Sequence, residues 1–174
     1  MAMDPTEPRE SDEELWALRE RAKELRCIYN VASALSRREE SPQTVFRWVL
    51  DAIPPAWQYP EDTTARIEYF GRTHAQPDFV DTPWRLRSPI SIWRTLVGAV
   101  EVHYKCPKPT AWEGPFLQEE RELLDDIAHR IGEYLEWKQG SSAANGWARH
   151  RNTGDGGSAS LSASPQPSIP LDSE

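Results

Sequence analysis

Cysteine and long apolar runs are scarce in this sequence, and each scarcity excludes a class of protein. Two cysteines among 174 residues, Cys27 and Cys106, are too few for a disulfide framework, so we expect free thiols. No run of about 18 apolar residues exists, and the N-terminus MAMDPTEPRESDEE is acidic where a signal peptide is basic. These features predict a cytoplasmic protein with no membrane partner.

Positive charge is also in short supply. The chain has 20 Lys and Arg against 28 Asp and Glu, which gives a net charge of −8. A protein that neutralises phosphates needs an excess of basic residues on one face. We therefore expect no nucleic-acid partner.

Catalytic motifs are missing as well. No serine of the core lies in a G-x-S-x-G turn, and no Cys–His pair has the setting of a catalytic triad. The acidic residues of the last predicted helix alternate with apolar ones at helical spacing, which is typical of a solvated face. They are Glu119, Glu120, Glu122, Asp125 and Asp126. We expect no enzyme activity; turnover that depended on Glu120 or His129 would overturn this expectation.

A metal site has too few ligands. His103 and Cys106 form an H-x-x-C pair, whereas zinc needs three or four ligands. Strand alternation also turns His103 outward, so the pair is better interpreted as an exposed histidine and a loop thiol. We expect neither a metal nor a cofactor.

Composition divides the chain into three parts. Residues 1–11 combine Pro, Glu and Ser with almost no apolar content, which predicts a disordered arm. From Gly140 onward the chain is rich in Gly, Ser, Ala and Pro, which predicts a disordered tail over residues 140–174. The remaining residues, 12–139, form one predicted domain.

The domain is expected to begin with two helices. Residues 13–38 carry apolar residues at alternating spacings of three and four, a heptad-like pattern of Leu15, Leu18, Ala22, Leu25, Tyr29 and Ala32. Ser41 before Pro42 predicts the N-cap of a second helix. Pro54 and Pro55 end that helix, because the residue before a proline is disfavoured in helical conformation.

Strands and a final helix follow. Residues 63–70 alternate like a strand with one buried face, and residues 72–80 predict a weaker edge strand that Pro77 interrupts. Residues 84–93 and 96–105 predict a β-hairpin that turns at Arg94-Thr95. Residues 115–139 predict a long closing helix. The order indicates an α+β domain whose antiparallel sheet has the long N- and C-terminal helices on one face.

Four segments of the chain resemble a known family. They are IPPAWQYPEDTTARIEY at 53–69, FVDTPWR at 79–85, VGAVEVHY at 97–104 and EGPFLQEERELLDDIAHRIGEYLE at 113–136. The last two follow the G-x-V-x-V strand, P-F-x-x-E-E turn and I-A-x-x-I-G helix that end GAF domains. The domain resembles the compact GAF-like modules found beside PAS domains and kinase modules in prokaryotic signalling proteins.

The resemblance implies a cytoplasmic regulatory domain, often dimeric through parallel terminal helices, that passes a signal to an output module. No kinase, GGDEF-like or DNA-reading segment follows residue 139, so a partner such as a sensor kinase or response regulator would supply the output. Two functions therefore stay open. The chain is either a stand-alone GAF-like regulatory domain or a detached input module of a sensor kinase that acts as a ligand-free interaction adaptor.

A small ligand is one further partner that the resemblance allows. GAF domains form their pocket among strands and adjacent loops, where this chain places aromatic residues and arginines. The candidate ligand residues are Trp57, Arg66, Tyr69, Trp84 and Tyr104. Alternatively, these aromatic residues only fill the space between sheet and helices. A haem would depend on His74 alone, and we do not expect one.

Dimerisation is expected through the terminal helices. The first helix is longer than a small sheet can cover, and both terminal helices carry apolar faces. The candidate dimer residues are Leu15, Leu18, Leu25, Tyr29, Ile127, Ile131 and Tyr134. We expect a homodimer.

Overall fold

The computed structural model describes residues 7–152, with side chains from residue 12 to residue 141. The elements in chain order are α1 (Glu7–Ser36), α2 (Pro42–Ala52), η1 (Pro54–Ala56), η2 (Pro60–Asp62), β1 (Thr63–Tyr69), β2 (Arg72–Ala75), β3 (Arg85–Ile92), β4 (Thr95–Tyr104) and α3 (Gln118–Asn152). The prediction of an α+β fold with an antiparallel sheet is confirmed.

The chain divides into two units at Gln139 and Gly140, and the description below concerns the first unit. The structure differs from the predicted disordered segments at residues 7–11 and 140–152, which continue α1 and α3 as helix. A helix that has already nucleated adds residues at little cost, even where the composition is polar. Residues 1–6 of the predicted arm and 153–174 of the predicted tail lie outside the described residues.

The four strands pair antiparallel in the order β2-β1-β4-β3. Two-residue turns close both hairpins, one at Phe70-Gly71 and one at Trp93-Arg94, and all four residues have positive φ. This is the backbone of a type I′ turn, whose twist matches that of the flanking strands. The predicted turn at Arg94-Thr95 is wrong by one residue, because Thr95 already pairs with Ile92.

Two strands form the edges of the sheet. The predicted edge strand after Gly71 exists as β2, but it ends after four residues at Ala75, before Pro77. The opposite edge is β3, which contains Pro89 and a register shift between Ile90 and Ser91. Both edges therefore offer little uninterrupted backbone.

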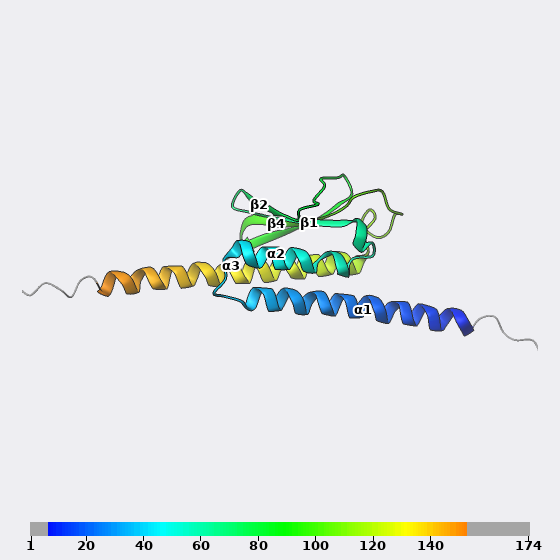
Figure 1. Cartoon of the computed structure of the whole chain (residues 1–174), viewed down its shortest axis with the longest axis horizontal. Coiled ribbons are helices and arrows are strands. Elements are labelled where there is room, and N and C mark those ends of the chain that lie inside the picture. Colours follow the sequence, from blue (N-terminus) through cyan, green and yellow to red (C-terminus); the bar gives the residue numbers. More distant parts are fainter. Residues whose placement is uncertain (1–6, 153–174) are drawn as a thin grey trace, which may run out of the picture. The chain divides into compact units, whose positions relative to one another are not determined.

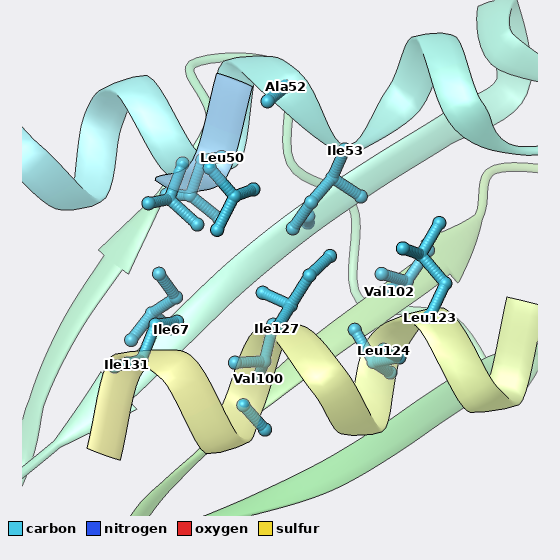
Figure 2. Close-up of a cluster of buried hydrophobic side chains, with 14 of the residues drawn as sticks. Leu50, Ala52, Ile53, Ile67, Val100, Val102, Leu123, Leu124, Ile127 and Ile131 are labelled. Carbon is cyan, nitrogen blue, oxygen red and sulfur yellow. The ribbon is translucent and has the colours of Figure 1, made fainter. Parts of the chain in front are cut away.

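The core lies between the sheet and the helices α2 and α3, which cover the same face of the sheet (Figure 1). Figure 2 shows Ile67, Val100 and Val102 of the strands facing Leu124, Ile127 and Ile131 of α3. α2 adds Leu50 and Ala52, and Ile53 follows directly after it. The predicted N-cap of α2 is confirmed, because Ser41 Oγ accepts a hydrogen bond from Thr44 N at 3.2 Å.

Two glycines allow close backbone contacts. A Cβ on Gly98 of β4 would lie 1.9 Å from Glu68 O of β1. A Cβ on Gly132 of α3 would lie 2.5 Å from Ser91 O of β3. These distances show that a side chain at either position would force the backbone apart.

Helix α1 forms a further layer. It contacts α2 and η1, and it lies on the side of the helices that faces away from the sheet (Figure 1). One side of α1 is therefore held by the domain. On the opposite side Leu15, Leu18, Leu25 and Tyr29 are exposed, and Ala32 lines a shallow cavity with Arg130 and Trp137 of α3.

Candidate functional site

Helix α1 has two stripes on opposite sides. The inner stripe consists of Glu20, Glu24, Cys27, Val31 and Ala34. Its last three members are buried, with exposed fractions of 2, 0 and 5%. The inner stripe attaches α1 to the domain.

The outer stripe consists of the heptad-like residues Leu15, Leu18, Ala22, Leu25, Tyr29 and Ala32, all of them exposed. Leu15, Leu18, Leu25 and Tyr29 are 50, 67, 61 and 73% exposed. Spacings of three and four keep these residues on one side of a helix. A contiguous apolar surface of this kind is typical of an interaction site.

The α3 members of the predicted dimer set lie elsewhere. Ile127 and Ile131 are fully buried, and Tyr134 is 5% exposed. All three belong to the core beneath the sheet. Of the predicted dimer residues, the structure therefore leaves only those of α1 open to a partner.

The five predicted ligand residues lie on both faces of the sheet. Trp57 and Tyr104 are fully buried in the core, and Tyr69 and Trp84 pack against it. Arg66 lies on the opposite face, since β1 alternates and its buried neighbours Ala65 and Ile67 face the helices. The structure does not bring the five side chains together around one space.

Two cavities lie at other places. One of about 590 Å³ lies between α2 and β2 and is lined by Arg47, His74 and Gln76 among others. A smaller one of about 190 Å³ lies between α1 and the start of α3, beside Trp16 and Glu120. None of the five predicted ligand residues lines either cavity.

A row of charged residues crosses the outer face of the sheet. Register places Glu101 of β4 opposite Arg66 of β1 and Arg87 of β3. Arg66 Nε donates to Glu101 Oε2 at 2.5 Å, and Arg87 donates to Glu101 Oε1. Glu68 lies within 3.7 Å of both guanidinium groups, 3.7 Å from Arg66 and 3.4 Å from Arg87. The two arginines are thus engaged with carboxylates of the chain itself.

Glu101 is completely buried. Burial raises the pKa of its carboxyl group, but hydrogen bonds from Arg87 and Arg66 outweigh that effect and lower the pKa below its ordinary value. Glu101 is therefore held as a carboxylate inside the protein.

The segment between β2 and β3 covers this row. Phe79 packs edge-on against His103, with ring centroids 5.0 Å apart, and the guanidinium of Arg66 lies 5.0 Å from the Phe79 ring. Thr82 N lies 3.2 Å from His103 Nδ1, and Thr82 Oγ1 donates to Tyr104 O at 2.8 Å. The expectation of an exposed His103 is wrong, because this segment buries an outward-facing position completely.

Glu120 is a second buried carboxylate, at the start of α3. Its Oε1 accepts hydrogen bonds from Gln58 N at 2.8 Å and Tyr104 OH at 2.9 Å, and its Oε2 accepts one from Leu117 N at 2.8 Å. Leu117 directly precedes the helix, so the last contact is the N3-to-N-cap half of a capping box. Burial raises the pKa of Glu120. This residue joins α3, β4 and the segment after η1.

We expect Glu120→Gln to lower the free energy of unfolding by about 1–3 kcal/mol, because an amide nitrogen cannot accept the Leu117 N–H. Urea unfolding followed by circular dichroism measures the change. Glu119→Gln, which alters an exposed carboxylate one residue away, is the matched control and should change stability by less than about 0.5 kcal/mol. Equal effects of the two substitutions would contradict the structural role of Glu120.

Sequence reasoning missed Glu101 and Gln76 as organising residues. Gln76 accepts a hydrogen bond from Ala65 N and donates one to Leu50 O, so it joins β1 to α2. A signal for Glu101 exists in the outward positions of the strands, which hold Arg66 and Glu68 in β1, Arg85 and Arg87 in β3, and Glu101 in β4. Opposite charges on adjacent strands attract, but only the register shows which residues are adjacent.

Comparison of the chain with protein-family models, curated proteins and solved structures gave no match. Within residues 7–152, no helix is both long enough and apolar enough to span a membrane. In the same part of the chain, no three His, Cys, Asp or Glu residues gather in a way that would hold a metal ion.

Proposed function

We propose that the chain is a GAF-like regulatory domain of signal transduction that acts by association of its α1 helix with a second copy. The outer stripe of α1 is the observation that supports this proposal. Four large apolar side chains on it are at least half exposed. Burial of these side chains in an interface would stabilise the associated state by roughly 1.5–3 kcal/mol for each side chain that is fully buried.

The attachment of α1 explains how association would reach the domain. The inner stripe packs on α2 and η1, and α2 in turn contacts β1 and β2. A change in the packing of α1 would therefore reach the sheet through α2. A ligand or partner that prefers one arrangement would shift the population toward it, and the same coupling would act in reverse.

The output of such a domain would come from a partner protein. The GAF resemblance supports a sensor kinase or a response regulator in this role, in a cytoplasmic setting. A small molecule that binds the domain would act as the input. The α2–β2 cavity, with its arginine and histidine, offers the larger space for one.

The charged row favours a second candidate, a ligand-free interaction adaptor. Arg66, a predicted ligand residue, and the neighbouring Arg87 are both engaged with Glu101 and are not free to bind an anionic ligand. Trp57 and Tyr104 have no exposed surface to offer. Native mass spectrometry of the full chain as purified distinguishes the candidates, since a retained small molecule favours the regulatory domain and a bare protein favours the adaptor.

The association itself is tested by analytical ultracentrifugation of the wild type and Leu18→Glu. We expect a dimer for the wild type and a monomer for Leu18→Glu, because two charges would enter the apolar interface. Leu96→Glu is the matched control, since Leu96 in β4 is 66% exposed and Leu18 is 67% exposed. It should leave the dimer intact.

Both substitutions change exposed side chains, so Leu96→Glu should unfold at the wild-type temperature, and Leu18→Glu should lose only the stabilisation that dimerisation adds. A wild type that remains monomeric over the accessible concentrations would contradict the proposal. A dimer that resists Leu18→Glu as well as Leu96→Glu would move the interface away from α1.

A further inference from the structure

We infer that two copies of the outer stripe pack antiparallel, with Leu15 of each helix beside Ala32 of the other. This inference rests on the proposed self-association, and it departs from the parallel arrangement that the family resemblance implies. It follows from the order of large and small residues along the outer stripe, and from the part of α1 that extends past the domain.

The outer stripe is complementary to its own reversed sequence. Along the helix it reads Leu, Leu, Ala, Leu, Tyr, Ala. An antiparallel pair forms the layers Leu15 with Ala32, Leu18 with Tyr29, and Ala22 with Leu25, each occurring twice. Every layer then contains at least one large side chain, and a two-fold axis relates the copies as a closed dimer requires.

A parallel, in-register pair would instead match each residue with itself. Two layers would consist of alanine alone, at Ala22 and Ala32, between layers of leucine or tyrosine. Each void larger than a methyl group weakens packing by about fivefold in the association constant. The two voids together would weaken a parallel dimer by roughly 25-fold.

The charges beside the outer stripe oppose this preference but are weaker. An antiparallel pair places Arg19 near Arg26 of the second copy, twice. A parallel pair would place Glu14 near Arg19, which attracts, and Arg21 near Arg26, which repels, so the effects cancel. An exposed pair of like charges costs about twofold, hence about fourfold for the two. Packing therefore decides the orientation.

The length of α1 agrees with the antiparallel arrangement. Residues 12–19 are all exposed, and the domain approaches them only at Trp16 and Ala17, which line the small cavity beside Leu117. In an antiparallel dimer this segment lies over Tyr29 and Ala32 of the second copy, where α1 is anchored to the domain by Val31. The projecting end of each helix thus covers the anchored end of the other.

Cross-linking tests the orientation in the full chain, with Cys106→Ser to remove the partly exposed native thiol. A mixture of Leu15→Cys and Ala32→Cys proteins, one carrying a larger tag, should oxidise to a mixed disulfide dimer. Leu15→Cys alone should not, because in the antiparallel dimer its two copies are about 17 residues, or roughly 26 Å, apart along the axis. A disulfide in Leu15→Cys alone would overturn the antiparallel inference.

Charge reversal gives a second readout that needs no oxidation. Arg19→Glu should lower the dimer Kd about tenfold, since it replaces two repulsions with two attractions. Arg21→Glu is the matched control and should leave the Kd unchanged, because Arg21 lies beside Ile28 of the second copy. The opposite pattern, with Arg19→Glu weakening and Arg21→Glu tightening, would show a parallel dimer.

The outcomes separate the two proposals. A protein that stays monomeric and forms neither disulfide contradicts the proposed function and the orientation together, and leaves the outer stripe to a different partner. A dimer that cross-links through Leu15→Cys alone contradicts only the orientation.

Discussion

Glu101→Leu should lower the free energy of unfolding by about 3 kcal/mol, one of the two largest effects that we expect. The carboxylate is completely buried and accepts hydrogen bonds from Arg66 and Arg87. Its removal leaves Arg66, which is 17% exposed, without its main partner. Arg87 is 49% exposed and regains water, which keeps the effect at the lower end of the range for buried pairs.

Glu68→Gln is the matched control for Glu101→Leu. Glu68 lies near the same two arginines, but its side chain is 34% exposed. We expect a loss below about 1 kcal/mol in urea unfolding. The double variant Glu101→Leu with Arg66→Leu should recover much of the lost stability, because it removes the uncompensated charge. A Glu101→Leu protein as stable as Glu68→Gln would contradict this account.

The contribution of Glu101 should also depend on pH. Its folded-state pKa is lowered from an ordinary value of 4.5. A lowered pKa means that the stabilisation is complete above the unfolded-state pKa and is lost as pH falls through the folded-state pKa. The stability difference between wild type and Glu101→Leu should therefore be constant near neutral pH and shrink below about pH 4.

Trp57→Ala should cost about 3–5 kcal/mol, the other large effect. Trp57 follows η1 and is completely buried in the core, where truncation leaves a cavity that neighbours cannot fill. The measurement is urea unfolding monitored by circular dichroism. Trp112→Ala, at a position that is 61% exposed, should cost less than about 0.5 kcal/mol.

Trp57→Phe separates volume from polarity at the same position. Among the described residues, the Trp57 Nε1 has no hydrogen-bond partner. The substitution Trp57→Phe therefore removes part of the side-chain volume but no hydrogen bond. It should lower the free energy of unfolding clearly less than Trp57→Ala does. If Trp57→Phe were as damaging as Trp57→Ala, an interaction of Nε1 beyond simple packing would have to be present.

The elements of this fold were predictable because local patterns specify them. Ser41 and Pro42 mark the start of α2, and the alternation of Val100, Val102 and Tyr104 identifies the buried face of β4. Both patterns depend on residues that are close in sequence, which is where propensity and periodicity are informative.

The charged row was not predictable, because its residues are far apart in sequence. Arg66 and Glu101 are separated by 35 positions, and their pairing depends on the register of β1 and β4. A turn that is misplaced by one residue, as in the prediction of Arg94-Thr95 for the turn at Trp93-Arg94, reassigns every cross-strand neighbour. The cover over His103 comes from Phe79 and Thr82, which belong to no strand or helix and so leave no periodic signal.

Helix α1 shows a different limit. Its sequence displays both stripes, and periodicity does not reveal which one the domain covers. The choice depends on the shape of the surface formed by α2 and η1, which accepts the small residues Cys27 and Ala34. The bulkier outer stripe stays exposed.

The edges of the sheet bear on how the protein behaves at high concentration. Unpaired strand edges are the usual route by which antiparallel sheets join edge to edge into aggregates. Here β2 offers only four residues, and β3 contains Pro89, which has no N–H for an incoming strand, beside an interrupted register. The molecule should therefore resist growth into extended cross-strand assemblies, so that the self-association proposed for α1 would stop at a defined number of copies.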